Sequence, residues 1–373
     1  MPFNLPLLQD AKGLRGQRVL LRLDLNVPIL NGQVREAYRV ERAAQTLSFL
    51  RAQGARTCII GHIESKETQS LRPVFDYLAS RIPLVFAETT AAAREALAEM
   101  REGEFVLLQN LRRWEGEKQN ADALARELAS LGDLFVNEAF SASHRAHAST
   151  VGAPRHLPHY AGFLFAEEVA HLSRAFSPAR PALCIIGGAK FETKIPLITK
   201  FLSIADSVYL CGALANDIYR ARGYETGISL VSVSPPEAAM ATDPKLIVPA
   251  DIVVQKGNER KAKSADTVAK DEKIVDAGPE ALSDLAALVE KARFVLWNGP
   301  LGEYESGFDA GTIALAQMLA ESDAEVIIGG GDSLAVVSKL GLLERFSFVS
   351  TGGGAMLQFL ADGTLPGIEA LTH

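Results

Sequence analysis

Residues 18–26 read Arg-Val-Leu-Leu-Arg-Leu-Asp-Leu-Asn, a short and mostly apolar run that leads into two polar residues, Asp24 and Asn26. Bounded apolar runs of this length predict β-strands. The same arrangement recurs along the chain, and longer segments rich in Ala, Leu and Glu, with apolar residues every three or four positions, separate the runs. This alternation predicts β-α-β units and a parallel sheet.

Ten runs are candidate strands. The first half of the chain contains R-V-L-L-R-L, T-C-I-I-G, E-F-V-L-L and L-F-V-N, and the second half contains L-C-I-I-G, S-V-Y-L, L-I-V-P, F-V-L-W, E-V-I-I-G and S-F-V-S. Helices are predicted between them, for example at residues 91–99 and 121–131. Because 373 residues exceed the size at which one core keeps growing, we expect two domains. A helix-like segment and a proline-marked stop between Gly162 and Pro181 place the boundary there.

Composition narrows the class of protein. Hydrophobic residues make up 48% and charged residues 22% of the chain, and no apolar run approaches the roughly 18 residues of a membrane span. Residues 1–10 lack the pattern of a secretory signal, so we expect a cytoplasmic protein. Three cysteines without C-x-x-C spacing indicate reduced core thiols. A net charge of -7 argues against general nucleic-acid binding, so any anion site is a local basic cluster.

The polar and glycine-rich residues stand directly after the predicted strands, where open α/β sheets bind ligands. Basic side chains dominate in the first half of the chain. They are Arg39, His62, Arg112, His144, Arg145 and His147. Glycine turns that precede helices dominate in the second half. Guanidinium groups bind phosphate and carboxylate with two hydrogen bonds, so the first set indicates a site for a small polyanion.

Each of these motifs has a simpler interpretation when it is taken alone. Residues 144–147 could form a solvated loop, or H-x-x-H could bind a metal, although the fixed charge of Arg145 opposes a second cation. Asp24 and Asn26 could be turn or capping residues, or they could orient a hydroxyl group of the same ligand. Lys190 and Lys194 could be exposed, or they could share one face of a helix that begins there.

The segment Gly329 to Ser333, G-G-G-D-S, follows a predicted strand and suggests a different kind of site. It places bare backbone amides at a helix start, where phosphate binds, with Asp332 able to hold a magnesium ion. The chain contains neither G-x-x-x-x-G-K-[ST] nor G-x-G-x-x-G. Nucleotide binding would therefore use another architecture.

Taken together, these strings resemble the phosphoglycerate kinase family along almost the whole chain. The resemblance rests on R-L-D-L-N-V-P, Y-R-V-E-R-A-A, G-A-R-T-C-I-I-G-H, L-L-Q-N-L-R, the run from Leu131 to Gly152, G-G-A-K-F-E-T-K-I, V-L-W-N-G-P-L-G-E-Y-E, I-I-G-G-G-D-S, S-T-G-G-G-A and L-P-G-I-E-A-L. Their order and spacing agree with the family's pattern.

The resemblance implies two doubly wound, Rossmann-like parallel-sheet domains that are joined by a helix and separated by a cleft. Residues 1–163 and a C-terminal return, 358–373, would bind phosphoglycerate. Residues 164–357 would bind the nucleotide, and a helix at about 164–177 would link the two domains. The implied reaction is the Mg²⁺-dependent transfer of a phosphoryl group between 1,3-bisphosphoglycerate and ADP, which yields 3-phosphoglycerate and ATP. A monomer is the family's usual state, and neither nucleic acid nor membrane is an implied partner.

The family's functional residues can be placed on this sequence motif by motif. The implied phosphoglycerate-binding residues are Asp24, Asn26, Arg39, His62, Arg112 and Arg145. The implied nucleotide-binding residues are Lys190, Lys194, Gly212, Asn298, Pro300, Glu305, Gly330, Gly331, Asp332 and Ser333, with Asp332 also holding the metal. The implied catalytic residues are Arg39, Lys190, Gly331 and Gly354.

Phosphoryl transfer requires positioning and neutralisation of the charge on the moving group, with no covalent intermediate. Arg39 and Lys190 would bracket that group, while the helix starts at Gly331 and Gly354 and the Mg²⁺ ion would complete its surroundings. The resemblance also implies that hinge closure between the domains excludes water from the acyl phosphate.

The chain departs from the family's pattern at several positions. Ser65 stands where the family has a phosphate-binding arginine, and the loop after His62 is shortened. We expect weaker substrate binding there, unless Lys66 or Arg113 compensates. Cys211 and Ala213 replace two glycines beside the nucleotide base. These changes keep open two alternatives to a phosphoglycerate kinase: a diverged acyl-phosphate kinase that acts on a related anion, and a non-catalytic nucleotide-binding paralogue.

Overall fold

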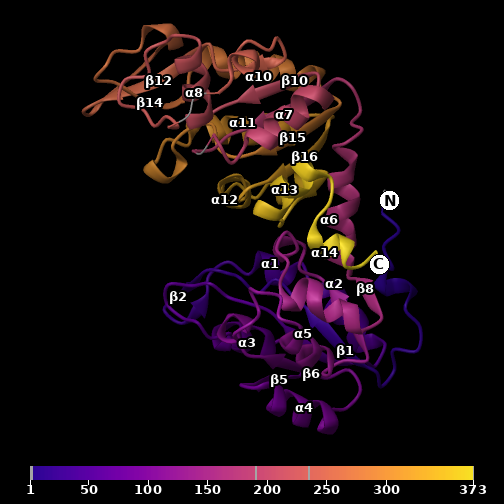
Figure 1. Ribbon diagram of the computed structural model, residues 1–373. Helices are drawn as coiled ribbons and strands as arrows, with labels where there is room; N and C mark the ends of the chain where they lie inside the picture. Colours follow the sequence, from indigo (N-terminus) through magenta and orange to yellow (C-terminus); the bar gives the residue numbers. More distant parts are fainter. Residues whose placement is uncertain (1–2, 190, 234–235, 373) are drawn as a thin grey trace. The chain divides into compact units, whose positions relative to one another are not determined.

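The computed structural model of the chain describes residues 3–189, 191–233 and 236–372 (Figure 1). The chain forms two compact units. The first comprises Met1–Ala170 and Gly363–His373, and the second comprises His171–Asp362. The sequence interpretation placed the corresponding limits at residues 163 and 358. Within the described ranges, every helix is too short or too polar to span a bilayer.

A six-stranded parallel sheet lies at the centre of the first unit. Its spatial order is β5 (Leu84–Ala87), β6 (Phe105–Leu108), β4 (Arg56–Ile60), β1 (Arg18–Arg22), β7 (Leu134–Asn137) and β8 (His159–Ala161). All residues of β6 and β7 are buried, which explains why both strands are apolar except for Asn137 at the end of β7. Strand β4 lies on one side of β1 and β7 lies on the other, so the strand order reverses at β1. The carboxyl end of β1 is therefore the switch point where such sheets bind ligands.

Helices complete the first unit (Figure 1). They are α1 (Tyr38–Glu41), α2 (Ala44–Ala52), α3 (Arg72–Ala79), α4 (Thr90–Glu99), α5 (Asp122–Ala129) and α14 (Pro366–Glu369). A two-stranded hairpin of β2 (Ile29–Leu30) and β3 (Gln33–Val34) follows β1. The C-terminal α14 belongs to this unit, because the Gly367 amide donates a hydrogen bond of 2.8 Å to the Ser143 carbonyl.

The second unit is built in the same way around its own six-stranded parallel sheet. The spatial order is β11 (Leu246–Ile247), β10 (Ser207–Leu210), β9 (Ala182–Ile186), β15 (Phe294–Asn298), β16 (Glu325–Gly329) and β17 (Phe348–Val349). Here β9 is the switch point, because β10 lies on one side of it and β15 on the other.

The second unit also carries a small antiparallel sheet of β13 (Glu259–Ser264), β12 (Asp251–Lys256) and β14 (Lys273–Ala277). Its helices are α7 (Ile195–Ile204), α8 (Ala213–Ala221), α9 (Ala238–Ala241), α10 (Pro279–Lys291), α11 (Ala310–Glu321), α12 (Gly331–Lys339) and α13 (Gly354–Asp362). Helix α8 packs on the antiparallel sheet, where Ala215 and Tyr219 share a core with Ile252 and Ile274 (Figure 1).

Helix α6 (Phe163–Arg174) carries the chain from the first unit into the second. Its start is held by Glu138, whose carboxylate accepts hydrogen bonds from the Leu164 amide at 3.1 Å and the Phe165 amide at 3.3 Å. Thr46 donates its hydroxyl to the same carboxylate at 2.6 Å. Burial raises the pKa of Glu138 to about 7 despite these hydrogen bonds.

The predicted fold class is confirmed: the chain is an α/β protein with two parallel, doubly wound sheets. All ten predicted runs contain strands, and the two predicted helices correspond to α4 and α5. The sequence interpretation missed β5 and β8 at the edges of the first sheet, the hairpin of β2 and β3, and the whole three-stranded antiparallel sheet. Residues of β13 are almost all exposed, so no apolar run marked that strand.

Candidate functional site

In the first unit, basic side chains gather near the carboxyl ends of neighbouring strands. We call Arg22, Arg39, His62, Arg112, Arg145 and His147 the basic cluster. Arg22 ends β1, His62 follows β4, Arg112 follows β6, and Arg145 and His147 follow β7. Burial lowers the pKa of His62 and that of His147, and the nearby positive charges of Arg22, Arg112 and Arg145 lower both further. Each predicted phosphoglycerate-binding residue lies in this cluster or contacts it.

Asp24 and Asn26 hold Arg39 at the edge of the cluster. The Arg39 guanidinium lies 3.5 Å from the Asp24 carboxylate and 3.5 Å from the Asn26 carbonyl. Asp24 is almost fully buried, and it also accepts hydrogen bonds from the Asn26 amide and the Ser141 hydroxyl. Asn26 accepts a hydrogen bond of 2.8 Å from the Glu64 amide. Both residues therefore shape the turn after β1 and also position a cation.

Arg22 is fully buried beneath the cluster. Its Nη2 lies 3.0 Å from Nδ1 of His62, and its Nε donates to the Ser149 hydroxyl at 3.0 Å. Ser149 in turn donates a hydrogen bond of 2.6 Å to the buried Glu117 carboxylate. Ser149 therefore bridges the guanidinium of Arg22 and this negative charge. Burial of a charged guanidinium is unfavourable unless hydrogen bonds and a nearby negative charge compensate for its lost hydration.

The two buried histidines of the cluster are neutral at pH 7. Burial and the charge of Arg22 lower the pKa of His62 to about 2. Burial and the charge of Arg112 lower the pKa of His147 to about 4. The positive charge of the cluster therefore comes from its arginines, and the histidines contribute neutral hydrogen-bonding groups.

The loop that departs from the family's pattern carries an acidic residue into the cluster. The Glu64 carboxylate lies 3.0 Å from Nε of Arg112, whose side chain is 9% exposed. Ser65 accepts a hydrogen bond of 3.1 Å from the Glu67 amide. Arg113, one of the two proposed substitutes for the missing arginine, lies 3.4 Å from Glu88 in an exposed ion pair.

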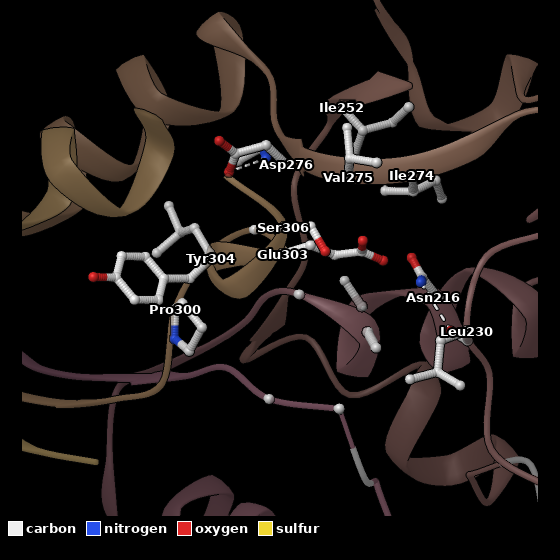
Figure 2. Close-up of a pocket in the computed structure, with 18 of the residues that line it drawn as sticks. Asn216, Leu230, Ile252, Ile274, Val275, Asp276, Pro300, Glu303, Tyr304 and Ser306 are labelled. Atoms are coloured by element: carbon white, nitrogen blue, oxygen red, sulfur yellow. Dashed lines mark hydrogen bonds between the residues drawn. The ribbon is translucent and has the colours of Figure 1, made fainter. Parts of the chain in front are cut away.

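The second unit contains a cavity of about 320 Å³ (Figure 2). The loops after β9, β10 and β15 form one side of it, and α8 and the antiparallel sheet form the other. The loops pass so closely that a Cβ atom at Gly187 would stand 2.2 Å from the Pro300 carbonyl oxygen. Glycine is required there because the two backbones touch.

Several predicted nucleotide-binding residues line this cavity. They are Gly212, Pro300, Glu305 and Asp332. The glycine-rich runs begin helices as predicted, since α12 starts at Gly331 and α13 at Gly354. Gly330 precedes α12 with φ +98°, a conformation that favours glycine. Ser333 is fully buried and accepts a hydrogen bond of 3.0 Å from the Gly299 amide, so its hydroxyl joins the first turn of α12 to the loop after β15.

Lys194 and Asn298 meet beside the same loops. Nζ of Lys194 donates a hydrogen bond of 2.6 Å to Oδ1 of Asn298, and burial lowers the pKa of the lysine to about 8. Nδ2 of Asn298 is buried and has no partner among the described residues. Helix α7 begins at Ile195, directly after Lys194. Lys190 lies outside the described residues.

The carboxylate predicted to hold a metal stands at the first turn of α12. Asp332 is exposed and is one of the residues that line the cavity. Within the described ranges, no three His, Cys, Asp or Glu side chains come together to form a metal-binding group. One carboxylate fits Mg²⁺, which binds one or two protein carboxylates together with substrate phosphates and water.

Sequence reasoning missed three residues that the structure places in these regions. Arg22 was treated as part of a strand, although an arginine inside an apolar strand buried on both faces was a usable signal. Asn216 and Glu303 line the cavity. Glu303 lies within the string V-L-W-N-G-P-L-G-E-Y-E, but only Asn298, Pro300 and Glu305 of that string were assigned a role, and Asn216 lies in α8 outside the quoted motifs.

Comparison with known proteins agrees with these features. The family model described as phosphoglycerate kinase matches residues 8–363. Phosphoglycerate kinase from Methylorubrum populi is 40% identical over 98% of both chains, and that from Herpetosiphon aurantiacus is 41% identical over 95% of this chain and 96% of the relative.

Solved structures agree as well. Phosphoglycerate kinase from Coxiella burnetii superposes with a TM-score of 0.84 at 34% identity and 99% coverage of both chains. That from Pyrococcus horikoshii OT3 gives 0.87 at 28% identity and 98% coverage. The family match over residues 8–363 and these relatives agree with the two doubly wound units, the basic cluster and the glycine-lined cavity, so the chain belongs to the phosphoglycerate kinase family.

Proposed function

We propose that this protein is an active phosphoglycerate kinase, which transfers a phosphoryl group reversibly between 1,3-bisphosphoglycerate and Mg-ADP to give 3-phosphoglycerate and Mg-ATP. The observation that carries the proposal is the basic cluster at the switch point of the first sheet, in a chain of this family. Its arginines offer paired donors at fixed positions, and its histidines are neutral. This combination suits a small ligand that carries both phosphate and carboxylate groups.

In this proposal the first unit binds the three-carbon acid. Arg39, Arg112 and Arg145 bind its charged ends, and His62 donates a hydrogen bond from Nε2. Asp24 and Asn26 orient Arg39 and lie within reach of a hydroxyl group on the ligand. The exposed fraction of the Arg39 side chain, 33%, leaves its guanidinium available to a reacting group.

The second unit would bind the nucleotide in its cavity. Glu305 would bind the ribose, Pro300 would pack against it, and Gly212 would leave room for the base. The amides at the start of α12, from Gly330 to Ser333, would bind phosphate oxygens. Two donors support this placement, the Lys194 ammonium and the unpartnered Nδ2 of Asn298.

Mg²⁺ would be held by Asp332 together with the nucleotide phosphates, and it would neutralise the charge that develops on them. The chain's own residues would do the rest. Arg39 and Lys190 would stabilise the charge on the transferred group, and the amides at Gly331 and Gly354 would bind its oxygens. A direct in-line transfer needs no residue that forms a covalent intermediate.

A coupled assay tests the proposal. Purified protein receives Mg-ATP and 3-phosphoglycerate, and glyceraldehyde-phosphate dehydrogenase reports the product by oxidising NADH. We expect turnover in the native chain and a loss of about 100-fold or more in kcat with Arg39→Ala, as when one transition-state donor is removed. Arg35→Ala is the matched control, because Arg35 is exposed four positions away and should leave the rate unchanged.

The same assay separates the alternatives. Absence of turnover with normal ATP binding would favour a non-catalytic paralogue, and turnover only with another carboxylic acid would favour a diverged acyl-phosphate kinase. A monomeric state and a cytoplasmic location also belong to this proposal. Sedimentation of the purified chain tests the first, and cell fractionation tests the second.

A further inference from the structure

Asn110 is a buried side chain that joins two segments next to the basic cluster. It stands two residues after the end of β6, and only 1% of its surface is exposed. It forms hydrogen bonds with the loop of residues 63–71, which follows His62, and with the short turn Leu111–Arg113, which contains Arg112. Asn110 therefore connects this loop to an arginine of the cluster.

Four hydrogen bonds use the full capacity of the Asn110 side chain. Nδ2 donates to the carbonyls of Ile63 and Gln69, both at 2.9 Å. Oδ1 accepts from the Ile63 amide at 3.2 Å and from the Arg112 amide at 3.1 Å. Because carbonyl oxygens accept and backbone amides donate, only one orientation of the carboxamide satisfies all four groups. The loop thus fixes the direction in which Oδ1 faces.

The hydrogen bond from the Arg112 amide fixes the backbone from which that arginine's side chain extends. It closes a turn of the kind that Asn forms with the amide two positions later. The Arg112 side chain is only 9% exposed, and its guanidinium lies 3.4 Å from Nδ1 of His147 and 3.0 Å from the Glu64 carboxylate. A packed guanidinium has little freedom to correct a shift of its backbone, so the turn sets where its donors stand.

Gln109, the preceding residue, is a second buried carboxamide on the same loop. Its hydrogen bonds within the described part of the chain go to the Leu71 amide, the Asn110 amide, the Ser70 hydroxyl and the Glu88 carboxylate. None of these bonds holds Arg112. The two carboxamides therefore both hold the loop, and they differ in their contact with the arginine.

We infer that Asn110 is a positioning residue of the substrate site, which holds Arg112 where its guanidinium meets an anionic group of the three-carbon acid. This inference rests on the proposed function, which assigns that ligand to the basic cluster. Asn110 is itself buried and acts through Arg112. Its effect should therefore fall on the affinity for the acid and leave nucleotide binding unchanged.

The test is calorimetric titration of the full chain with 3-phosphoglycerate and, separately, with ADP. Asn110→Ala removes Oδ1. We expect its affinity for 3-phosphoglycerate to fall about tenfold or more, as when one charge-assisted hydrogen bond is lost, and its affinity for ADP to stay within about twofold of the native value. Equal affinity of the native chain and Asn110→Ala for 3-phosphoglycerate would overturn the inference.

Asn110→Ser differs from Asn110→Ala by one hydroxyl oxygen. A serine hydroxyl forms the same turn more weakly than Asn, so we expect the affinity for 3-phosphoglycerate to fall by only about threefold. Recovery in this variant would come from the acceptor, because the two side chains are of nearly equal size. Identical losses in Asn110→Ser and Asn110→Ala would count against a role for the bond to the Arg112 amide.

Gln109→Met is the matched control. It removes the other buried carboxamide of the loop and leaves the hydrogen bond between Asn110 and Arg112 in place. The melting temperature should fall, while the affinity for 3-phosphoglycerate should stay within about twofold of the native value. A loss as large as that of Asn110→Ala would mean that order in the loop sets the affinity, and the inference would be wrong.

His147 supplies a readout that needs no ligand. Burial, and next the charge of Arg112, lower the pKa of His147 to about 4. If Arg112 moves in Asn110→Ala, the pKa of His147 should rise, and an NMR titration of the imidazole measures it. The same titration of Gln109→Met should match that of the native chain. An unchanged pKa in Asn110→Ala would show that Arg112 keeps its place without Asn110.

The outcomes separate this inference from the proposed function. Failure of the native chain to bind 3-phosphoglycerate would remove the proposed function, while the titration of His147 would still test the hold of Asn110 on Arg112. Binding with native affinity in Asn110→Ala would remove only the inference. If Asn110→Ala does not fold, Asn110→Ser decides: native affinity together with a native pKa of His147 would overturn the inference.

Discussion

Nη2 of Arg22 lies 3.0 Å from Nδ1 of His62, and both side chains are buried. A guanidinium has donors and no acceptor, so Nδ1 of His62 must accept this hydrogen bond. The proton of the neutral imidazole is therefore on Nε2. A buried strand residue that touches no solvent thus decides which hydrogen bond His62 can offer to a ligand.

This relationship predicts a single tautomer of His62. In ¹⁵N NMR spectra, Nδ1 should show the shift of an unprotonated ring nitrogen and Nε2 that of a protonated one. Because burial and the charge of Arg22 lower the pKa of His62 to about 2, the pattern should persist down to about pH 4. Titration of His62 near its usual pKa of about 6.5 would contradict the prediction.

Removing Arg22 should abolish the preference of His62 for this tautomer. Arg22→Met is expected to give a mixture of tautomers and a raised pKa for His62. It should also cost about 3–5 kcal/mol in stability, because the Glu117 carboxylate stays buried without its cation. Ser149→Ala is the control: it removes the hydrogen bond to Nε of Arg22 and leaves the contact with His62. An unchanged ¹⁵N pattern in Arg22→Met would show that Arg22 does not select the tautomer.

Glu64→Gln should strengthen substrate binding. Glu64 lies 3.0 Å from Arg112 and is 47% exposed, so its charge competes with an incoming phosphate or carboxylate. An exposed ion pair contributes up to about 1 kcal/mol, which predicts a KM for 3-phosphoglycerate about three- to fivefold lower, with little change in kcat. Glu67→Gln, an exposed neighbour in the same loop, should leave KM unchanged. A KM that rises in Glu64→Gln would mean that the carboxylate positions Arg112.

Nucleotide affinity should depend on pH through Lys194. Its pKa is lowered to about 8 by burial, so the ammonium form is lost as pH rises through 8. A nucleotide phosphate binds the ammonium form, and ADP affinity should therefore fall by up to about tenfold per pH unit above 8. Lys194→Arg keeps its charge and should abolish that dependence. Parallel pH profiles for the native chain and Lys194→Arg would exclude the role of this lysine.

Stability should depend on pH through Glu138. Its pKa is raised to about 7, first by burial, and the neighbouring Glu167 charge acts in the same direction. The folded state thus binds a proton more tightly than the unfolded state, whose carboxyl titrates near 4.5. The stabilisation is complete below about pH 4.5 and is lost as pH rises through 7.

Glu138→Gln removes this titration. Denaturant unfolding of the native chain and the variant at several values between pH 5 and 8 should show the native chain losing up to roughly 3 kcal/mol relative to the variant as pH rises, at 1.36 kcal/mol per pKa unit. The histidines contribute equally to the free energy of unfolding of both proteins, so their contributions cancel when the two are compared. If the free energies of unfolding of the native chain and Glu138→Gln differ by the same amount at every pH between 5 and 8, the raised pKa of Glu138 is contradicted.

Local sequence was sufficient for much of the candidate site. Asp24, His62 and Arg112 follow apolar strands, and strand ends of a parallel sheet meet at one edge, so their proximity could be predicted without coordinates. The glycine-rich runs before α12 and α13 allowed two helix starts to be predicted from local sequence as well. The contact between Arg22 and His62 could not be predicted in this way, because it joins residues that are 40 positions apart in the chain.

By itself, the sequence determined the alternation of strands and helices, the α/β class, the family and the identity of the residues at the strand ends, because all of these follow from local periodicity and short motifs. Tertiary structure alone decided that Arg22 faces His62 and that Glu64 reaches Arg112. Hydrogen bonding, burial and pKa values depend on distances of a few ångströms between segments far apart in the chain. A linear sequence pattern specifies which side chains are present, and the packing of the folded protein sets the distances between them.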